Sequence, residues 1–242
     1  MSAFVACVAY AARVCVPPKR WALLALPLVA SVLFGLLARV VDDGTRAEGL
    51  ATVGEGLFGL VLPFATLVVG DAVLGAEVRS GAFSLTWLSP TPFSTIVLAR
   101  WLAGWAISAV ALAPAMVGAA LAAGVPEATG ALVLAAVVAA GAYVAVFVLI
   151  GSTVQRAALW SLAFVLLIER LIGTALAGVA QLSPQWLART VYGDLGPDAD
   201  DLLRSGVPSG VGAIVRLAIV GAVTLALATR RVRHLRLVGA TD

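Results

Sequence analysis

The chain has 242 residues, of which 62% are hydrophobic and 12% charged, and its formal net charge is +3. Soluble domains carry roughly a quarter charged residues, so this composition, with a mean hydropathy of +1.05, excludes an ordinary soluble protein. The apolar residues form blocks of about 20, which is the length that crosses a bilayer as a helix. Because long continuous apolar runs favour helices over a membrane barrel, we expect an all-α integral membrane protein.

The first sixteen residues, MSAFVACVAYAARVCV, are apolar and end at Pro17 and Pro18. A signal peptide carries its positive charge before the apolar core, whereas Arg13 follows most of this one. We interpret residues 1–20 as a helix lying in the cytoplasmic interface of the membrane. A cleaved segment and a seventh span are the alternatives.

Six spans are predicted within a transmembrane domain of residues 21–229, which a basic tail of residues 230–242 follows. The predicted spans are residues 21–41, 52–69, 101–121, 131–151, 158–180 and 211–228.

Basic residues indicate the orientation, because they are enriched in cytoplasmic loops. With six spans both termini share one side, which holds Arg13, Lys19, Arg20, Arg79, Arg100, Arg156, Arg230, Arg231, Arg233 and Arg236. The other side holds Arg39, Arg46, Arg189 and Arg204. We therefore expect a multi-pass cell-membrane protein with cytoplasmic termini. Its tail RRVRHLR is expected to meet anionic lipid headgroups rather than nucleic acid.

Motifs for catalysis or for metal binding are sparse. A P-loop needs a glycine-rich turn ending in Gly-Lys-Ser/Thr, and Lys19 is the only lysine. His234 is the only histidine, which leaves a histidine-based metal site without partners. Cys7 and Cys15 are expected on the reducing side, where a disulfide is rare. We expect a protein without a catalytic site, metal or cofactor of its own.

The segment EVRSGAFSLTWLSPTPFSTIVLARW, residues 77–101, separates the second and third predicted spans. Ser80 is a favourable N-cap, and Pro90 disfavours helical geometry at the residue before it; a short helix is predicted between them. Phe83 and Trp87 are four residues apart and share one side of that helix. The helix lies either in the headgroup region, as an aromatic anchor, or against a soluble partner.

The pattern of Glu77, Gly81, Leu85, Leu88 and Pro90, followed by VLARW, resembles the stretch after the second span in permeases of ABC-2-type transporters. The resemblance extends to the layout of a short N-terminal interfacial helix, six spans, cytoplasmic termini and a long outer segment between spans five and six. It implies a coupling helix that docks on a separate P-loop ATPase subunit, in a transporter of two permeases and two ATPases. Haem-exporter membrane subunits have a similar DGSLEQLLLSPLP segment, but this chain lacks the acidic residue after the leucine.

The resemblance assigns the contact with the ATPase to the residues of this segment. They are Glu77, Arg79, Ser80, Gly81, Phe83, Ser84, Trp87, Leu88 and Pro90. Phe83 and Trp87 are the candidate anchors, since aromatic residues often dominate contact energies. The second permease is another copy of this chain or a similar protein.

Glu169 and Arg170 lie about twelve residues into the fifth predicted span, roughly 18 Å deep at the rise of a helix. A charge there costs at least about 2.5–3.5 kcal/mol on insertion scales unless it is paired or faces water. Glu55 and Arg216 are the candidate partners. Three interpretations stay open: the charges line the translocation path, they form a buried pair that fixes packing, or the fifth span ends early and they lie at the outer interface.

Short re-entrant helices are expected between the fifth and sixth spans, as the resemblance implies. Ser183 and Pro184 predict the start of one such helix, and Gly193 its end. The acidic segment GDLGPDADDLL that follows does not have the spacing of an EF-hand and is expected to be a solvated loop.

The expected function is the permease subunit of an ATP-driven exporter, which moves a hydrophobic or amphipathic substrate by alternating access. An ion-coupled secondary transporter, with Glu55 or Glu169 as its proton site, is the alternative. A membrane enzyme or an assembly scaffold is a third class, for which the sequence holds no catalytic cluster.

Overall fold

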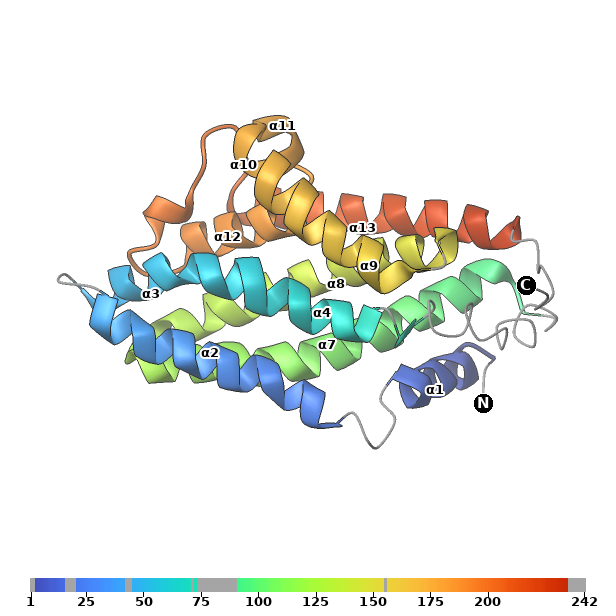
Figure 1. The fold of residues 1–242 in the computed structure, drawn as a ribbon, viewed down its shortest axis with the longest axis horizontal. Helices are drawn as coiled ribbons and strands as arrows, with labels where there is room; N and C mark the ends of the chain where they lie inside the picture. Colours follow the sequence, from blue (N-terminus) through green and yellow to red (C-terminus); the bar gives the residue numbers. More distant parts are fainter. Residues whose placement is uncertain are drawn as a thin grey trace.

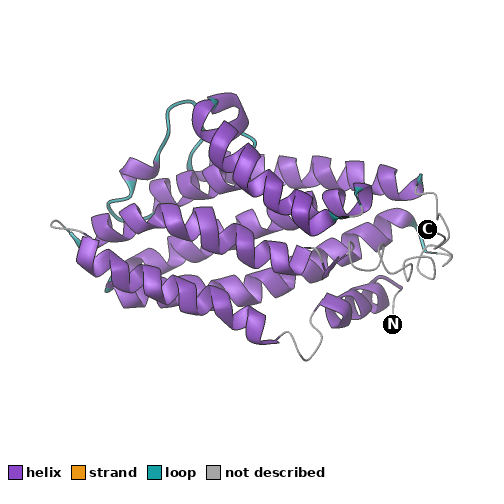
Figure 2. Cartoon of the chain, in the orientation of Figure 1, coloured by secondary structure: helices purple, strands orange, loops and turns teal. Residues whose placement is uncertain are grey.

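The computed structural model describes residues 3–15, 21–41, 45–70, 72–73, 91–154 and 156–234. These residues form helices and loops, with no β-strand among them (Figure 2). Six helices in the described ranges are long and apolar enough to cross a membrane. The expected all-α class and the six apolar helices are therefore confirmed.

Some helices of the described residues are separated by loops, and others follow one another directly and form one longer helix. Their bounds are α1 Ala3–Cys15, α2 Trp21–Val41, α3 Arg46–Gly56, η2 Leu57–Val61, α4 Leu62–Gly70, α7 Phe93–Ala123, η4 Pro126–Ala128, α8 Thr129–Thr153, α9 Ala157–Ala163, η5 Phe164–Ile172, α10 Gly173–Ala175, α11 Ala177–Ala180, α12 Pro184–Leu195, η6 Asp200–Leu202 and α13 Gly210–Arg233. The second span is composed of α3, η2 and α4, and the fifth of α9, η5 and α10. In both composite spans the middle part, η2 or η5, is π-helical.

The spans lie side by side, with α1 and the end of α13 at one end of the bundle (Figure 1). The short helices α10, α11 and α12 lie toward the opposite end, where α2 ends and α3 begins. Helix α8 is the central element, because it packs against α4, α7, α9, α12 and α13. Its buried side chains include Leu132, Ala136, Ala140, Tyr143 and Phe147. The core is therefore built around the fourth span.

Small residues bring the spans close together inside this bundle. A Cβ atom added at Gly70 of α4 would lie 2.7 Å from the Cβ of Phe147 in α8. One added at Gly118 of α7 would lie 3.0 Å from a methyl carbon of Val32 in α2. Close helix approach through small residues is typical of membrane bundles, and here these glycines serve the contacts within one chain.

Local signals explain where several spans begin and end. Thr45 caps α3 and forms a capping box with Glu48, so the second span starts six residues before the predicted residue 52. Gly124 ends α7 in the left-handed conformation, with φ of 81°, which glycine adopts without a steric penalty. Leu176 is extended, with φ of −117° and ψ of 112°, so the fifth span ends at Ala175 rather than at the predicted residue 180.

The N-terminal helix α1 packs against the first part of α7. Ala11 and Cys15 are buried, whereas Phe4, Val5 and Tyr10 are exposed. Cys15 joins a second group of buried apolar residues contributed by α4, α7, α8 and α13. The helix therefore docks on the bundle through one narrow stripe and presents an apolar outer face.

Candidate functional site

The predicted contact helix for the ATPase lies outside the described residues. This applies to Glu77, Arg79, Ser80, Gly81, Phe83, Ser84, Trp87, Leu88 and Pro90. The structure describes the four predicted intramembrane residues, which are Glu55, Glu169, Arg170 and Arg216.

Glu169 is fully buried and is the centre of a hydrogen-bonded group. Its Oε2 atom accepts a hydrogen bond from the hydroxyl of Tyr143 on α8. Its Oε1 atom accepts one from the Ser183 hydroxyl at 2.6 Å and one from the backbone N–H of Gln185 at 3.2 Å. Because a buried carboxylate is costly unless it is hydrogen-bonded, these three donors explain how the side chain is held inside the protein.

The same contacts anchor the start of α12. Ser183 is the N-cap of this helix, and its hydroxyl also accepts from the backbone N–H of Trp186 at 3.4 Å. A carboxylate at a helix N-terminus meets free N–H groups and the positive end of the helix dipole. The indole of Trp186 adds a 3.4 Å bond to the backbone oxygen of Glu169. Glu169 therefore fastens α12 to the fifth span and to α8.

Glu55 does not pair with Glu169 or Arg170 but with Arg189 of α12. The Arg189 guanidinium donates to Glu55 Oε1 at 3.1 Å and to the backbone oxygen of Glu55 at 3.3 Å. The Arg189 side chain is 6% exposed, whereas that of Glu55 is 66% exposed. Burial lowers the pKa of the Arg189 guanidinium, and the neighbouring Glu55 carboxylate offsets only part of this decrease. The pair joins the second span to α12 at the edge of the buried group.

Two guanidinium groups, those of Arg189 and Arg204, lie against the ring of Trp186. Arg189 lies 4.7 Å from the centroid of the Trp186 ring, and Arg204 lies 4.5 Å from it. Arg204 also donates to the backbone oxygens of Gly173 and Thr174, at 2.6 and 2.7 Å. Cations at the C-terminal carbonyls of a helix are stabilising, so Arg204 closes the end of the fifth span.

The π-helical turn of the second span makes room for these side chains. A Cβ atom added at Gly59 in η2 would lie 2.6 Å from Nη2 of Arg170, 3.0 Å from Nε2 of Gln185 and 3.2 Å from Nη2 of Arg189. Three polar side chains thus converge on Gly59, which has no side chain of its own. Single π-helical turns occur frequently at functional sites, and here both π-helical segments, η2 and η5, border the same group of residues. We name Glu55, Tyr143, Glu169, Ser183, Gln185 and Arg189 the polar cluster.

Helix α12 carries a stripe of polar atoms toward the second span. Gln185, Arg189 and Tyr192 are spaced by four and three residues and therefore share one face. Oε1 of Gln185, Nε of Arg189 and the hydroxyl of Tyr192 are buried and have no hydrogen-bond partner among the described residues. The interface between α12 and the second span is therefore polar and incompletely paired.

The structure corrects the partners expected for the intramembrane charges. Arg216 of α13 donates to Oε1 of Gln181 at 2.6 Å, so neither Glu55 nor Arg216 bonds to Glu169 or Arg170. The reason is the segment between the fifth and sixth spans, which folds back and supplies its own polar groups. Arg170 is exposed, with its guanidinium against Gly59.

Sequence reasoning missed three members of the polar cluster. Tyr143 lies within an apolar block, and Arg189 was counted as a basic residue of an outer loop, although it is buried. Gln185 immediately follows the Ser183 and Pro184 start signal, which correctly predicted the beginning of α12. That signal, together with the position of Glu169 inside an apolar block, was the one indication that the helix N-terminus meets the carboxylate.

The chemistry of the cluster is that of charge neutralisation and hydrogen bonding. Among the described residues no group of three or more histidine, cysteine, aspartate or glutamate side chains could hold a metal ion. The polar cluster holds two carboxyl groups, those of Glu55 and Glu169, and one guanidinium group, that of Arg189; of the two carboxyl groups, Glu169 is the buried one. No protein-family model and no curated protein matches the chain.

Proposed function

We propose that the chain is the permease subunit of an ATP-driven ABC exporter of the ABC-2 type. The observation that carries the proposal is the arrangement of the described helices. A short apolar helix, α1, precedes six apolar spans, and the short helices α11 and α12 lie between the fifth and sixth spans. This is the layout that the resemblance of the segment after the second span implies.

The proposal gives the extra helices defined positions. Helix α1 lies in the cytoplasmic interface, where its exposed Phe4, Val5 and Tyr10 contact lipid. Helices α11 and α12 are re-entrant helices on the outer side, because they lie toward the end of the bundle opposite to α1 and to the end of α13 (Figure 1). Irregular backbone within a membrane must be buried in protein or face water, and the polar cluster meets this requirement for the start of α12.

The energy source is a separate ATPase subunit. The coupling helix that begins at Ser80 docks on it, with Phe83 and Trp87 as the anchors and Glu77 and Arg79 as orienting charges. Two permeases, either two copies or this chain with a similar one, form the translocation path. ATP-driven closure of the ATPase pair moves the coupling helices, and the bundle alternates its access for a hydrophobic or amphipathic substrate.

The polar cluster is a positioning device in this mechanism. Because Glu169 binds the start of α12 to the fifth span and Arg189 binds α12 to the second, the outer helices move together with these two spans. Glu169, Arg170, Glu55 and Arg216 then act through helix packing at the outer end of the path.

Co-purification with an ATPase tests the proposal. The tagged chain is purified from its native membrane, a P-loop ATPase subunit that accompanies it is identified, and the ATPase activity of the complex is measured in lipid. Phe83→Ala and Trp87→Ala are expected to lower the stimulated hydrolysis at least tenfold, whereas Trp160→Ala, an exposed aromatic of the fifth span, leaves it unchanged. A chain that binds no ATPase, or a stimulated activity that survives both substitutions, would refute the proposal.

An ion-coupled secondary transporter is the second candidate, and one observation favours it. Glu169 is a fully buried carboxyl on a span and is hydrogen-bonded to a tyrosine hydroxyl, which is a common setting for proton relays. Uptake driven by a proton gradient without ATP, and lost in both Glu169→Gln and Glu55→Gln, would support this candidate and exclude the exporter.

A further inference from the structure

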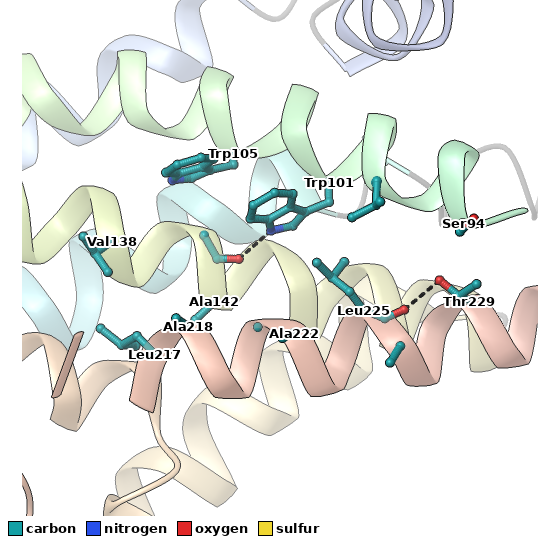
Figure 3. A pocket seen from close by; sticks show the side chains of 14 residues that line it. Ser94, Trp101, Trp105, Val138, Ala142, Leu217, Ala218, Ala222, Leu225 and Thr229 are labelled. Carbon is teal, nitrogen blue, oxygen red and sulfur yellow. Dashed lines mark hydrogen bonds between the residues drawn. The ribbon is translucent and has the colours of Figure 1, made fainter. Parts of the chain in front are cut away.

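An apolar groove runs along the surface between α7, α8 and α13, away from the polar cluster. Its volume is about 640 Å³. Figure 3 shows Trp101 and Trp105 of α7 on one wall, Leu217, Ala222 and Leu225 of α13 on the other, and Ala142 of α8 between them. The residues of α8 and α13 that line the groove include several small ones, such as Gly141, Ala218 and Gly221, and these leave the space between the flanking helices open.

The walls of the groove offer almost nothing to a hydrogen-bonding ligand. The indole N–H of Trp101 donates to the backbone oxygen of Gly141 at 2.8 Å, and that of Trp105 to the oxygen of Val137 at 2.8 Å. The two rings are stacked, with centroids 5.2 Å apart. With both indole nitrogens already bonded, the tryptophans present only apolar ring surface. An aliphatic chain is the ligand that suits such walls.

The length of the groove matches a lipid acyl chain. On α13 the lining extends from Leu217 to Thr229, which is about 18 Å at the rise of a helix. This length is close to one leaflet, since the hydrocarbon core of a bilayer is roughly 30 Å thick. An acyl chain that lies along the groove therefore stays within a single leaflet, with its headgroup at one end of the groove.

One end of the groove is basic. Thr229 and Ala226 line the groove at this end, and Arg233 and Arg230 follow them by four residues, so they extend the two lining rows of α13 by one turn. Both arginines are exposed. Side chains of a helix lean toward its N-terminus, which here directs these guanidinium groups back toward the groove. Arg231 follows Leu227, which does not line the groove, and provides a matched reference.

We propose that this groove binds one acyl chain of an anionic glycerophospholipid, whose phosphate lies between Arg230 and Arg233. The lipid belongs to the leaflet that surrounds the end of α13. This binding site goes beyond the proposed transport function and does not depend on it, because it needs only a membrane and the described face of α7, α8 and α13. The apolar walls select the tail, and the two arginines select the headgroup charge.

Quenching of tryptophan fluorescence by brominated lipid tests the site directly. The full chain is reconstituted in phosphatidylcholine nanodiscs that contain a low, increasing fraction of phosphatidylglycerol with brominated acyl chains. A saturable quenching phase is expected, and it should be absent in Trp101→Phe/Trp105→Phe. Brominated phosphatidylcholine at the same fractions is expected to give only the gradual quenching of exposed tryptophans such as Trp160.

Substitutions on α13 separate the headgroup from the tail. Each charge near a membrane surface changes affinity about fivefold, so Arg230→Gln/Arg233→Gln should raise the half-saturating fraction of phosphatidylglycerol about 25-fold, while Arg231→Gln leaves it near the wild-type value. Ala222→Leu fills the groove and should abolish the saturable phase. Val223→Leu, at an exposed position outside the groove, is its control and should preserve it.

Three results would overturn the proposal. Equal quenching by the two brominated lipids would show that no anionic lipid is selected. A saturable phase that survives Ala222→Leu would place the lipid elsewhere. A dimer that protects Trp101 from both lipids, and that Ala222→Leu converts to a monomer, would show that a second copy occupies the groove.

Discussion

Ser183 connects the fifth span to α12 through a single hydroxyl, which donates to Oε1 of Glu169 at 2.6 Å and accepts from the backbone N–H of Trp186 at 3.4 Å. Serine at an N-cap is common, but here the cap hydroxyl also serves a buried carboxyl. One hydroxyl therefore both caps the short helix α12 and provides a hydrogen-bond donor to the buried carboxyl group of Glu169.

Ser183→Ala removes both bonds. Loss of an N-cap costs about 1 kcal/mol, and loss of a buried hydrogen bond to a charged group about 1.5–3 kcal/mol, so we expect a decrease in stability of about 2–4 kcal/mol. Chemical unfolding in detergent measures it. Ser205→Ala is the control, because Ser205 is exposed in the turn before α13, and it should change stability by less than about 0.5 kcal/mol. Equal effects of the two substitutions would contradict this role of Ser183.

Glu169→Ala leaves the hydroxyls of Tyr143 and Ser183 and the N–H of Gln185 without their acceptor inside the protein. We expect a loss of about 3–5 kcal/mol, because three buried donors lose their acceptor at once and each unsatisfied buried group costs about 1–3 kcal/mol. Glu169→Gln keeps an oxygen acceptor of the same shape and should cost about 1–2 kcal/mol. Thermal unfolding of the two variants in one detergent gives the comparison, and a Gln variant as unstable as the Ala variant would disprove the hydrogen-bonding role.

Arg189 and Glu55 are expected to contribute unequally, although they form one ion pair. Glu55 is largely exposed, and exposed pairs contribute about 0–1 kcal/mol, so Glu55→Gln should have a small effect. Arg189→Met removes the backbone bond to Glu55 and the stacking on Trp186 as well, with an expected cost of about 2–3 kcal/mol. The double variant measures the coupling between the side chains. A Glu55→Gln effect as large as that of Arg189→Met would show that the charge pair itself dominates.

Gly70→Ala tests the close approach of α4 and α8. The added methyl group would lie 2.7 Å from Cβ and Cδ2 of Phe147, which is buried, so one of the two helices must shift. Overpacking of this kind costs about 1–3 kcal/mol. Gly130→Ala in α8 has nothing within 4 Å of the new carbon and should be neutral or stabilising by up to about 1 kcal/mol. Melting temperatures in detergent compare them, and a neutral Gly70→Ala would mean that the interface is looser than described.

Much of the architecture could be predicted from local sequence. Apolar length determined the six spans, because a helix must cover the hydrocarbon core with residues that need no water. The start of α12 followed from Ser183 and Pro184, since capping involves only neighbours in the chain. By contrast, the second span begins earlier than predicted because the capping box of Thr45 and Glu48 extends the helix beyond the apolar block.

The partners of the buried charges were decided only by the tertiary structure. The sequence alone showed that Glu169 needed partners, because an unpaired charge in a membrane is costly. It did not show that they would be Tyr143, Ser183 and Gln185, since helix positions far apart in the chain meet only after packing. The close approach of the spans is a similar case, because the contacts of Gly70 with α8 and of Gly118 with α2 exist only after the helices have packed. Composition determines what must be buried, whereas the three-dimensional arrangement of the helices determines which group lies against it.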